Sequence, residues 1–260
     1  MGSEFELLQE AKKLLEREPK LIVLSGERAV FVGDTHGDLE ASGLVLSRYL
    51  VPGTKLVFLG DYVDRGPESR ENILFLLEQK LAHPQDLILL MGNHEGWGIE
   101  KFSPADFWLG LDPQEERLYT GTLARLPLVA ATPNGVIALH GALPDIESLE
   151  EIDKIEPGSE PWQQITWGDW SDLPGEALGT GLSGRPAFGR AYFDRLMKRF
   201  GKNLLIRSHQ PDAPEELFAR RCLTIFTSSA YRGLRAARTV AVVPLGQEVR
   251  SAADIELEAI

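Results

Sequence analysis

Three short apolar segments decide the fold: RAVFVGD (28–34), KLVFLGD (55–61) and LILLMGN (87–93), each of which ends in glycine followed by Asp or Asn. The stretches between them, 39–50 and 67–81, read as helices. Buried strands that alternate with helices predict a parallel sheet with right-handed connections. Functional groups in such sheets gather beyond the carboxyl ends of the strands. We therefore expect the polar residue that closes each segment to lie at one shared edge.

The rest of the chain predicts further helices and strands. Segment 6–18 has apolar residues at helical spacing, so we divide the chain into an N-terminal helix or tag-bearing extension, 1–20, and a single domain, 21–260. A hairpin is expected around 133–135, and the Gly-, Pro- and Trp-rich segment 157–184 is expected to be a long loop. The other expected elements are a broken helical region at 102–126, a helix at 188–200, and strands of a second sheet at 204–206, 223–227 and 239–243.

Composition excludes several classes of protein. The chain has 260 residues, one Cys, and 27 Lys+Arg against 39 Asp+Glu, for a formal net charge of -12. A single Cys excludes a secreted disulfide scaffold. The sequence has neither an apolar run of about 18 residues nor a leader pattern, so we expect no membrane partner and a cytoplasmic location. We also expect a monomer. The acidity argues against nucleic acid as a partner, because like charges repel.

Six polar residues at predicted strand ends form a candidate metal-ligand set. Taken singly, an Asp after a strand is usually a helix cap or a turn residue. Together, carboxylate, amide and imidazole ligands without a thiolate suit Mn, Fe or Zn. Six ligands with one bridging carboxylate fit two ions about 3.5–4 Å apart, the arrangement used for in-line displacement at phosphorus. The six are Asp34, His36, Asp61, Asn93, His140 and His209. Of the other two histidines, His94 adjoins this set and His83 is expected on the surface.

Three of these loops resemble known signature motifs. GDTHG (33–37), GDYVDRG (60–66) and GNHE (92–95) are similar to the motifs of the phosphoprotein phosphatase (PPP) family, which are metal-dependent serine/threonine phosphatases of the calcineurin-like metallophosphoesterase fold. The resemblance covers most of 28–243. Its downstream matches are His140-Gly141, with Ala142 where the family has a second Gly, WGDWSD (167–172) against Trp-Ser-Asp-Pro, the Arg185 segment (184–189), RSHQ (207–210), and 224–231, which ends in Tyr231.

The resemblance implies a fold and a dinuclear site. The fold is α/β, a metallophosphoesterase-type sandwich of two mixed β-sheets flanked by helices, with the metals at the carboxyl ends of strands. Residues 21–260 would form a single metallophosphatase catalytic domain. Two divalent ions are implied, Mn²⁺ first, with Fe or Zn as alternatives. The first would be held by Asp34, His36 and the bridging Asp61, and the second by Asp61, Asn93, His140 and His209.

The same resemblance implies catalytic roles. A hydroxide shared by the two ions would attack phosphorus directly. His94 would protonate the leaving alkoxide, and Asp64 would hold its tautomer; the alternatives for Asp64 are a salt bridge to Arg65 or a helix cap. The phosphoryl group would be bound by Arg65, Asn93, Arg185 and Tyr231, although a surface salt bridge for Arg185 and core packing for Tyr231 remain open.

The predicted substrate is phosphoserine or phosphothreonine in a protein or peptide. The intact second Asp of the middle motif (Asp64) and the Glu of GNHE favour this over the alternative, a diadenosine tetraphosphatase-like hydrolase. Broad specificity that includes phosphotyrosine is a further alternative. A scaffold without activity would require a missing ligand, and none is missing.

Overall fold

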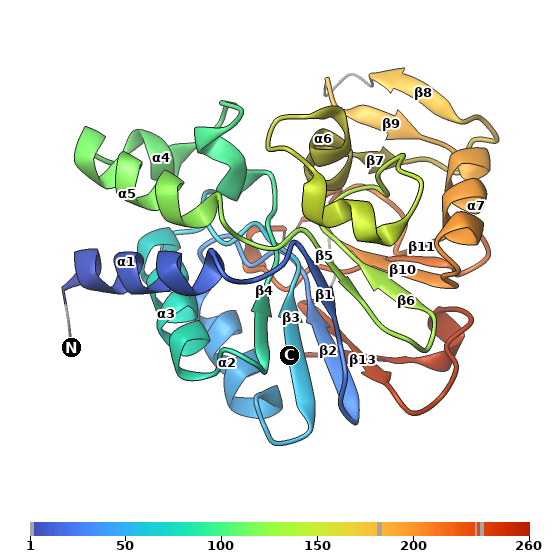
Figure 1. Ribbon diagram of the computed structural model, residues 1–260, viewed down its shortest axis with the longest axis horizontal. Coiled ribbons are helices and arrows are strands. Elements are labelled where there is room, and N and C mark those ends of the chain that lie inside the picture. Colours follow the sequence, from blue (N-terminus) through green and yellow to red (C-terminus); the bar gives the residue numbers. More distant parts are fainter. Residues whose placement is uncertain (1–2, 181–183, 232, 235–236) are drawn as a thin grey trace.

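Two mixed β-sheets pack face to face and helices cover their outer faces (Figure 1). The structure is a computed structural model, and it describes residues 3–180, 184–231, 233–234 and 237–260. The five-stranded sheet has the order β14-β13-β2-β3-β4, and the six-stranded sheet has the order β1-β5-β6-β10-β12-β11. This arrangement confirms the α/β sandwich of two mixed sheets that the motifs predict.

The five-stranded sheet contains the three segments that open the sequence analysis. β2, β3 and β4 are parallel neighbours, as predicted, while β13 and β14 extend the sheet in antiparallel fashion. The prediction that 239–243 belongs to the second sheet is wrong: β13 pairs with β2, since an apolar run does not specify its partner. The strands are β2 (Arg28–Val32), β3 (Thr54–Phe58), β4 (Leu87–Leu89), β13 (Thr239–Pro244) and β14 (Glu256–Ala259).

The six-stranded sheet is built around the predicted hairpin. β5 and β6 are antiparallel, and β10 lies between β6 and β12 and runs parallel to both. Two short edge strands, β1 and β11, were not predicted. The strands are β1 (Leu21–Val23), β5 (Val129–Ala131), β6 (Val136–Ala138), β10 (Leu204–Arg207), β11 (Glu216–Leu217) and β12 (Cys222–Thr224).

The alternation of side chains along each strand divides the core in two. Phe31 and Val57 face the other sheet and pack in the centre of the sandwich with Ile206. Val30 and Leu56 point the opposite way, into the layer of helices. Every one of these five side chains is fully buried, so the strands of both sheets are fixed in position where they reach the site.

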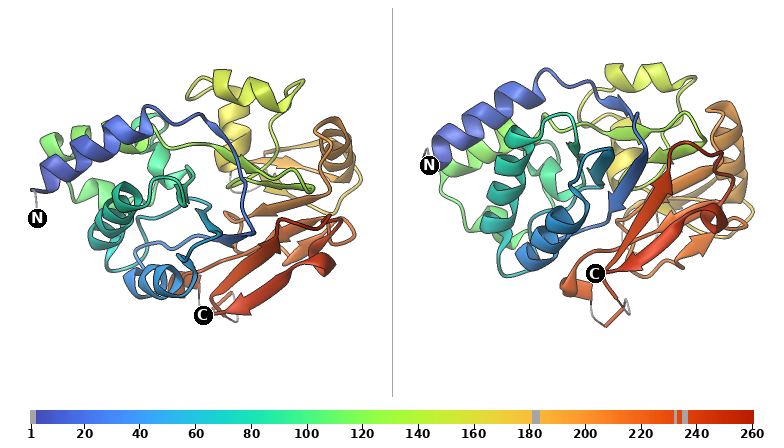
Figure 2. Two further views of the ribbon diagram at one scale, coloured as in Figure 1. Left: turned by 60° about the horizontal axis from the view of Figure 1, so that its bottom comes forward. Right: turned by 90° about the horizontal axis from the view of Figure 1, so that it is seen from below.

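Helices cover the outer face of the five-stranded sheet (Figures 1 and 2). Helix α1 begins with a capping box at Ser3 and packs against α3 and α5. The region 102–126 contains two helices, α4 and α5, rather than one, as its prolines predict. No helix in the described part of the chain is long and apolar enough to cross a membrane. These helices are α1 (Glu4–Leu15), α2 (Leu39–Tyr49), α3 (Ser69–Ala82), α4 (Asp106–Leu109) and α5 (Pro113–Leu123).

The prediction of a long loop at 157–184 is wrong, because much of this segment has regular structure. It contains α6 and two strands of a third sheet of order β7-β9-β8, while 181–183 lie outside the described residues. Strands of two to four residues with partly exposed side chains give no alternation signal. The elements are α6 (Glu160–Trp167), β7 (Asp169–Trp170), β8 (Ala177–Thr180), β9 (Pro186–Phe188) and α7 (Arg190–Arg199).

Candidate metal centre

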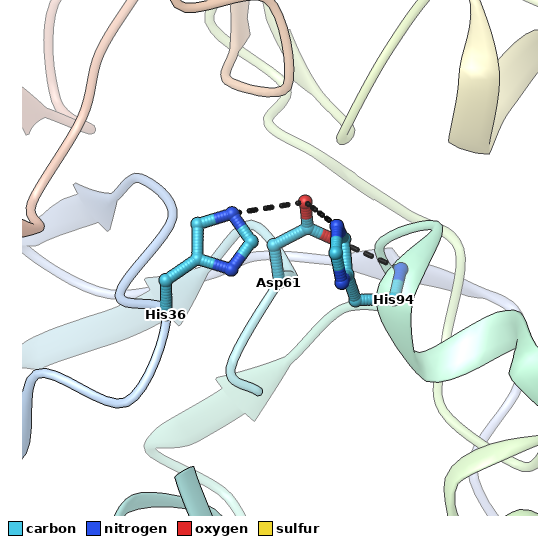
Figure 3. Close-up of side chains that lie close together, drawn as sticks. All are labelled: His36, Asp61 and His94. Carbon is cyan, nitrogen blue, oxygen red and sulfur yellow. Dashed lines mark hydrogen bonds and ion pairs between the residues drawn. The ribbon is translucent and has the colours of Figure 1, made fainter. Parts of the chain in front are cut away.

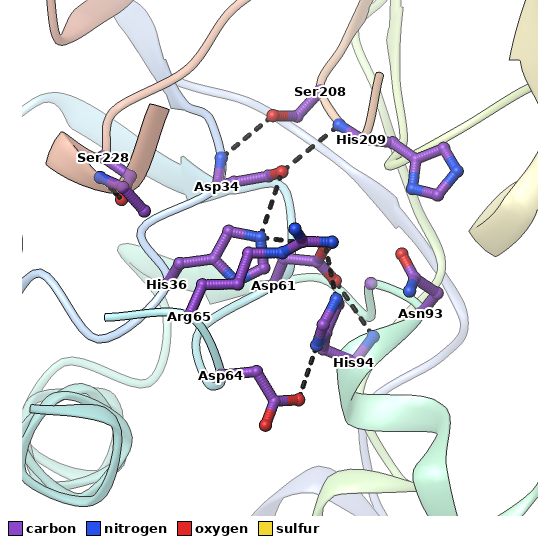
Figure 4. A network of polar contacts seen from close by, with 12 residues as sticks. Asp34, His36, Asp61, Asp64, Arg65, Asn93, His94, Ser208, His209 and Ser228 are labelled. Atoms are coloured by element: carbon purple, nitrogen blue, oxygen red, sulfur yellow. Dashed lines mark hydrogen bonds and ion pairs between the residues drawn. The ribbon is translucent and has the colours of Figure 1, made fainter. Parts of the chain in front are cut away.

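The six predicted ligands converge at one edge of the sandwich. Figure 4 labels all of them except His140. Three of them follow parallel strands of the first sheet: Asp34 after β2, Asp61 after β3 and Asn93 after β4. Two follow strands of the second sheet: His140 after β6 and His209 after β10. The two sheets meet at this edge, where Asp34 forms a parallel bridge with Phe226. All six candidate ligands, including His36, are at most 2% exposed.

Asp61 lies at the centre of the cluster. Its Oδ2 is 3.5 Å from His36 Nε2 (Figure 3) and 3.3 Å from His140 Nε2. His36 Nε2 is also 3.6 Å from Asp34 Oδ2. His140 Nε2 lies 3.1 Å from Asn93 Oδ1 and 3.1 Å from His209 Nδ1. Potential ligand atoms therefore surround Asp61 on two sides, one with His36 and one with the His140–His209 pair.

The donor atoms of this cluster fit two divalent cations. Outward-facing ring nitrogens are bound to the backbone: His36 Nδ1 is 2.8 Å from Val63 O, and His140 Nδ1 is 2.9 Å from Leu59 O. These contacts place the proton on Nδ1 and leave each Nε2 lone pair facing inward. Burial and the charge of Asp61 raise the pKa of Asp34 to about 6. Converging lone pairs and two buried carboxylates are unfavourable without a cation between them.

The backbone of the site is held in an unusual conformation. Five of its non-glycine residues have positive φ: His36 (42°), Asp61 (56°), Asp64 (66°), Arg65 (69°) and His209 (71°). Each left-handed residue costs roughly 1–2 kcal/mol relative to the right-handed region. Such strain persists only where surrounding structure imposes it, and it concentrates at functional sites. The sequence offers no sign of it, because none of these positions is a glycine.

Glu95 supports the cluster, a role that differs from the sequence prediction, in which this Glu served only to distinguish substrate classes. Its carboxylate accepts backbone N–H groups of Asp61 (2.8 Å), Tyr62 (2.8 Å) and Gly92 (3.0 Å). It therefore ties the end of β3 to the end of β4. Burial, with the charge of Asp61, raises the pKa of Glu95 to about 7. Its place directly after Asn-His was the signal that could have identified it.

His94 is paired with Asp64 beside the cluster (Figure 4). His94 Nδ1 lies 2.5 Å from Asp64 Oδ2, and the other oxygen of Asp64 accepts Phe107 N–H at 2.7 Å. The structure thus joins Asp64 to His94 through one oxygen and to the first turn of α4 (Asp106–Leu109) through the other, and it records no ion pair between Asp64 and Arg65 among the described residues. His94 Nε2 lies 3.9 Å from Asp61 Oδ2, near enough that His94 groups with His36 and Asp61 as a potential ligand set. Burial opposes protonation of His94, but Asp61 and Asp64 outweigh it and raise its pKa.

A family model decides the classification of the chain. Residues 27–213 match the model for calcineurin-like phosphoesterases. The chain belongs to the calcineurin-like phosphoesterase family. This confirms the family fold expected from the three motifs and makes the chain a metal-binding phosphoesterase.

Solved structures share the fold of this phosphoesterase. A protein serine/threonine phosphatase from Saccharomyces cerevisiae with similarity to human phosphatase PP5 is 20% identical, with a TM-score of 0.81 over 99% of this chain and 88% of that chain. A cold-active protein-tyrosine phosphatase of a psychrophile Shewanella sp. is 16% identical, with a TM-score of 0.58 over 95% and 84%. A putative diadenosine tetraphosphatase is 17% identical, with a TM-score of 0.55 over 93% and 98%.

Two arginines flank the cluster of the phosphoesterase. Arg65 extends across the cluster in Figure 4, and its guanidinium lies 5.7 Å from the ring centre of Tyr231. Tyr231 is 6% exposed, and its hydroxyl lies 2.7 Å from His36 Nε2, so it faces the site. Arg185 Nη1 is 3.8 Å from Asp169 Oδ1. The phosphoesterase thus places two guanidinium groups at the site.

A cavity of about 330 Å³ lies beside the cluster. Phe102 forms part of its wall, and its ring centre is 4.7 Å from that of His94 and 5.4 Å from that of Trp167. Trp167 in turn lies 6.1 Å from the ring of His209. The cavity is lined by Glu100, Phe102, Gln163, Trp167, Thr180, Gly184, Arg185 and Pro186. In the phosphoesterase it is open space next to the candidate ligands.

Proposed function

We propose that this phosphoesterase is a metal-dependent phosphomonoesterase that hydrolyses phosphoserine and phosphothreonine in proteins or peptides. The observation that carries the proposal is the buried Asp64–His94 pair, which lies next to the cluster centred on Asp61. A phosphomonoester with an alkoxide leaving group needs a proton at that oxygen, and a positioned imidazole supplies it. The leaving group of a dinucleotide substrate is a phosphate anion, which depends less on protonation than an alkoxide does.

The ligand set is proposed as Asp34, His36, Asp61, Asn93, His140 and His209. Two divalent ions held there, Mn²⁺ by preference and Fe or Zn as alternatives, would supply Lewis-acid activation of water and of the phosphoryl oxygens. The chain itself would orient the substrate. Arg65 and Arg185 present forked donors that match phosphoryl oxygens, while the amide of Asn93 lies beside His140 and the hydroxyl of Tyr231 lies beside His36.

His94 would act as the general acid. With Nδ1 bound to Asp64, its proton for the leaving group sits on Nε2, the atom that faces Asp61. Asp64 and Asp61 favour the imidazolium form that such an acid requires. Asp64 is itself fixed by Phe107 N–H and is fully buried, so the ring of His94 has one preferred orientation. With His94 as the acid, the histidine ligand of the first ion would be His36.

The alternatives are tested with three substrates. The purified protein is chelated, reloaded with Mn²⁺, Fe²⁺ or Zn²⁺ singly, and assayed on phosphoserine/phosphothreonine peptides, a phosphotyrosine peptide and diadenosine tetraphosphate. We expect the first class to be turned over fastest. Cleavage of the dinucleotide alone would contradict the proposal, and faster turnover of phosphotyrosine would favour the activity named for the Shewanella neighbour.

Two variants separate proton transfer from metal binding. His94→Asn should lower kcat on a phosphopeptide by about 10²–10⁴-fold while the metal content stays at the level of the unmodified protein. Asp61→Asn, the matched control in the same cluster, should lose metal as measured by elemental analysis. If His94→Asn also loses metal, His94 is a ligand, as its place in the cluster allows, and the acid must be another group.

The proposal also covers partners, oligomeric state and location. The partner would be a phosphorylated protein or peptide, with no nucleic acid or membrane, and the enzyme would act as a cytoplasmic monomer. The net charge of -12 supports the exclusion of extended polyanions.

A further inference from the structure

Three buried polar atoms without hydrogen-bond partners lie at or near Trp167, which forms part of the wall of the 330 Å³ cavity. They are Trp167 Nε1, Asp169 Oδ1 and His209 Nε2. Asp169 Oδ1 and His209 Nε2 face each other at 3.6 Å. A buried polar group without a hydrogen-bond partner lowers stability. A buried acceptor and a buried donor that face each other beyond hydrogen-bond distance therefore call for a functional explanation.

The third sheet holds Asp169 in place. β7 and β9 are parallel, and Asp169 is paired with Ala187. Arg185, which directly precedes β9, has its guanidinium 6.0 Å from the ring centre of Trp167, and its Nη1 lies 3.8 Å from the same Oδ1 of Asp169. The buried Arg207 donates to Gly168 O at 3.1 Å, so the peptide before Asp169 is held as well.

Two arginines lie near Asp169, whose side chain is 15% exposed. Burial raises the pKa of its carboxyl, and the positive charges of Arg207 and Arg185 act against that rise. Arg207 also donates to Gly141 O at 3.2 Å, directly after His140. One arginine therefore fixes Asp169 relative to both histidines of the second candidate ligand group.

The proton on His209 links this carboxylate to the cluster. His209 Nδ1 is the nitrogen that faces His140 Nε2, at 3.1 Å. A neutral imidazole that presents Nδ1 to a cation carries its proton on Nε2, and Nε2 is the atom that faces Asp169. A carboxylate on the outer nitrogen of a ligating histidine fixes the ring and increases its basicity.

We propose that Asp169 is a positioning residue for the second ion: its carboxylate accepts the Nε2 proton of His209 and keeps Nδ1 directed at Asp61 and His140. The inference rests on the proposed metal site, but it does not depend on which phosphoester is cleaved. Within WGDWSD it assigns the role to Asp169 and not to Asp172, whose side chain is 59% exposed and pairs with Arg190.

The test is a metal titration of the chelated protein. Calorimetry with Mn²⁺ is carried out on the unmodified chain, Asp169→Ala, Asp169→Asn and the matched control Asp172→Asn. We expect two sites in the unmodified chain, and in Asp169→Ala a 10- to 100-fold weaker affinity at one of them, with the other unchanged. Asp169→Asn should recover part of the loss, because an amide oxygen still accepts the Nε2 proton. Asp172→Asn should match the unmodified chain.

Several outcomes would overturn the inference. Unchanged affinities in Asp169→Ala would do so, as would equal weakening of both sites, a single site in the unmodified chain, or an effect of the same size in Asp172→Asn. Urea unfolding of each chelated variant checks folding, and if Asp169→Ala is unfolded the comparison passes to Asp169→Asn, which must then weaken one site selectively. Failure of the proposed function is read separately, from substrate turnover by the unmodified chain.

Discussion

Ser208→Ala is the sharpest test of how the two sheets are held together at the site. The hydroxyl of Ser208 accepts Asp34 N–H at 2.9 Å and donates to Ile225 O at 2.7 Å. These three residues follow β2 of one sheet and β10 and β12 of the other. Ser208 is fully buried, so removal of the hydroxyl leaves two backbone groups without this partner.

The expected cost follows from those two groups. A buried donor or acceptor left unsatisfied costs about 1–3 kcal/mol. Two of them give a loss of about 2–6 kcal/mol in the free energy of unfolding, out of a typical total of about 5–15 kcal/mol. Even the lower bound would reduce Tm by about 4–8 °C for a domain of this size. Asp34 is a proposed ligand, so affinity for metal should fall in the same variant.

The assay is urea unfolding followed by circular dichroism in the presence of chelator. Chelation is needed because a bound ion stabilises the folded state and would mask the effect. Ser47→Ala is the matched control: its hydroxyl donates to Leu44 O on an exposed helix face, and its removal should change stability by less than about 0.5 kcal/mol. A loss for Ser208→Ala no larger than that of Ser47→Ala would refute the reasoning.

Two further predictions concern backbone space and pH. Gly60 has a φ of 106°, and a Cβ there would lie 2.3 Å from Gly92 N, so Gly60→Ala should prevent soluble expression. The control is Gly43 on α2, where a Cβ would enter open space. Gly43→Ala should stabilise the protein by about 0.5–1 kcal/mol in urea unfolding. Hydrogen bonds from Arg195 lower the pKa of Asp145 in the folded state. The stabilisation that Asp145 gives is therefore fully present above the pKa of the unfolded chain, and it is lost as the pH falls through the lower pKa of the folded state. Asp145→Asn should flatten the fall of the urea midpoint below about pH 4, and an unchanged profile would contradict this.

The parallel core was predictable because its signals are local. Each of β2, β3 and β4 is an apolar run that ends in glycine and a polar residue, and α2 and α3 fill the intervals between them. Since parallel strands end at one edge, the convergence of Asp34, Asp61 and Asn93 followed from chain order alone.

Pairing between distant segments was not predictable in the same way. The apolar residues of β13 fit either sheet, and only its antiparallel register with β2 decides the matter. The short strands β7 and β8 give no alternation signal, so the sequence predicts a loop at 157–184, where two strands of the third sheet lie. For this reason the sequence could not show that Asp169, rather than Asp172, faces the site. The motif supplied two Asp residues, and the choice between them depends on the β7–β9 pairing.

Part of the negative charge of the chain is concentrated at the site. Five carboxylates are gathered in or against the cluster: Asp34, Asp61, Asp64, Glu95 and Asp169. Many surface arginines are already paired with acids, as in the contacts of Arg195 with Asp145 and Glu176. Among the residues that the structure describes, no ion pair engages the guanidinium of Arg65. A phosphate that approached the cluster without cations would meet several buried negative charges and few opposing ones. The overall acidity and an anionic substrate are therefore compatible only if divalent ions supply the local positive charge, which makes phosphate binding itself depend on the metal.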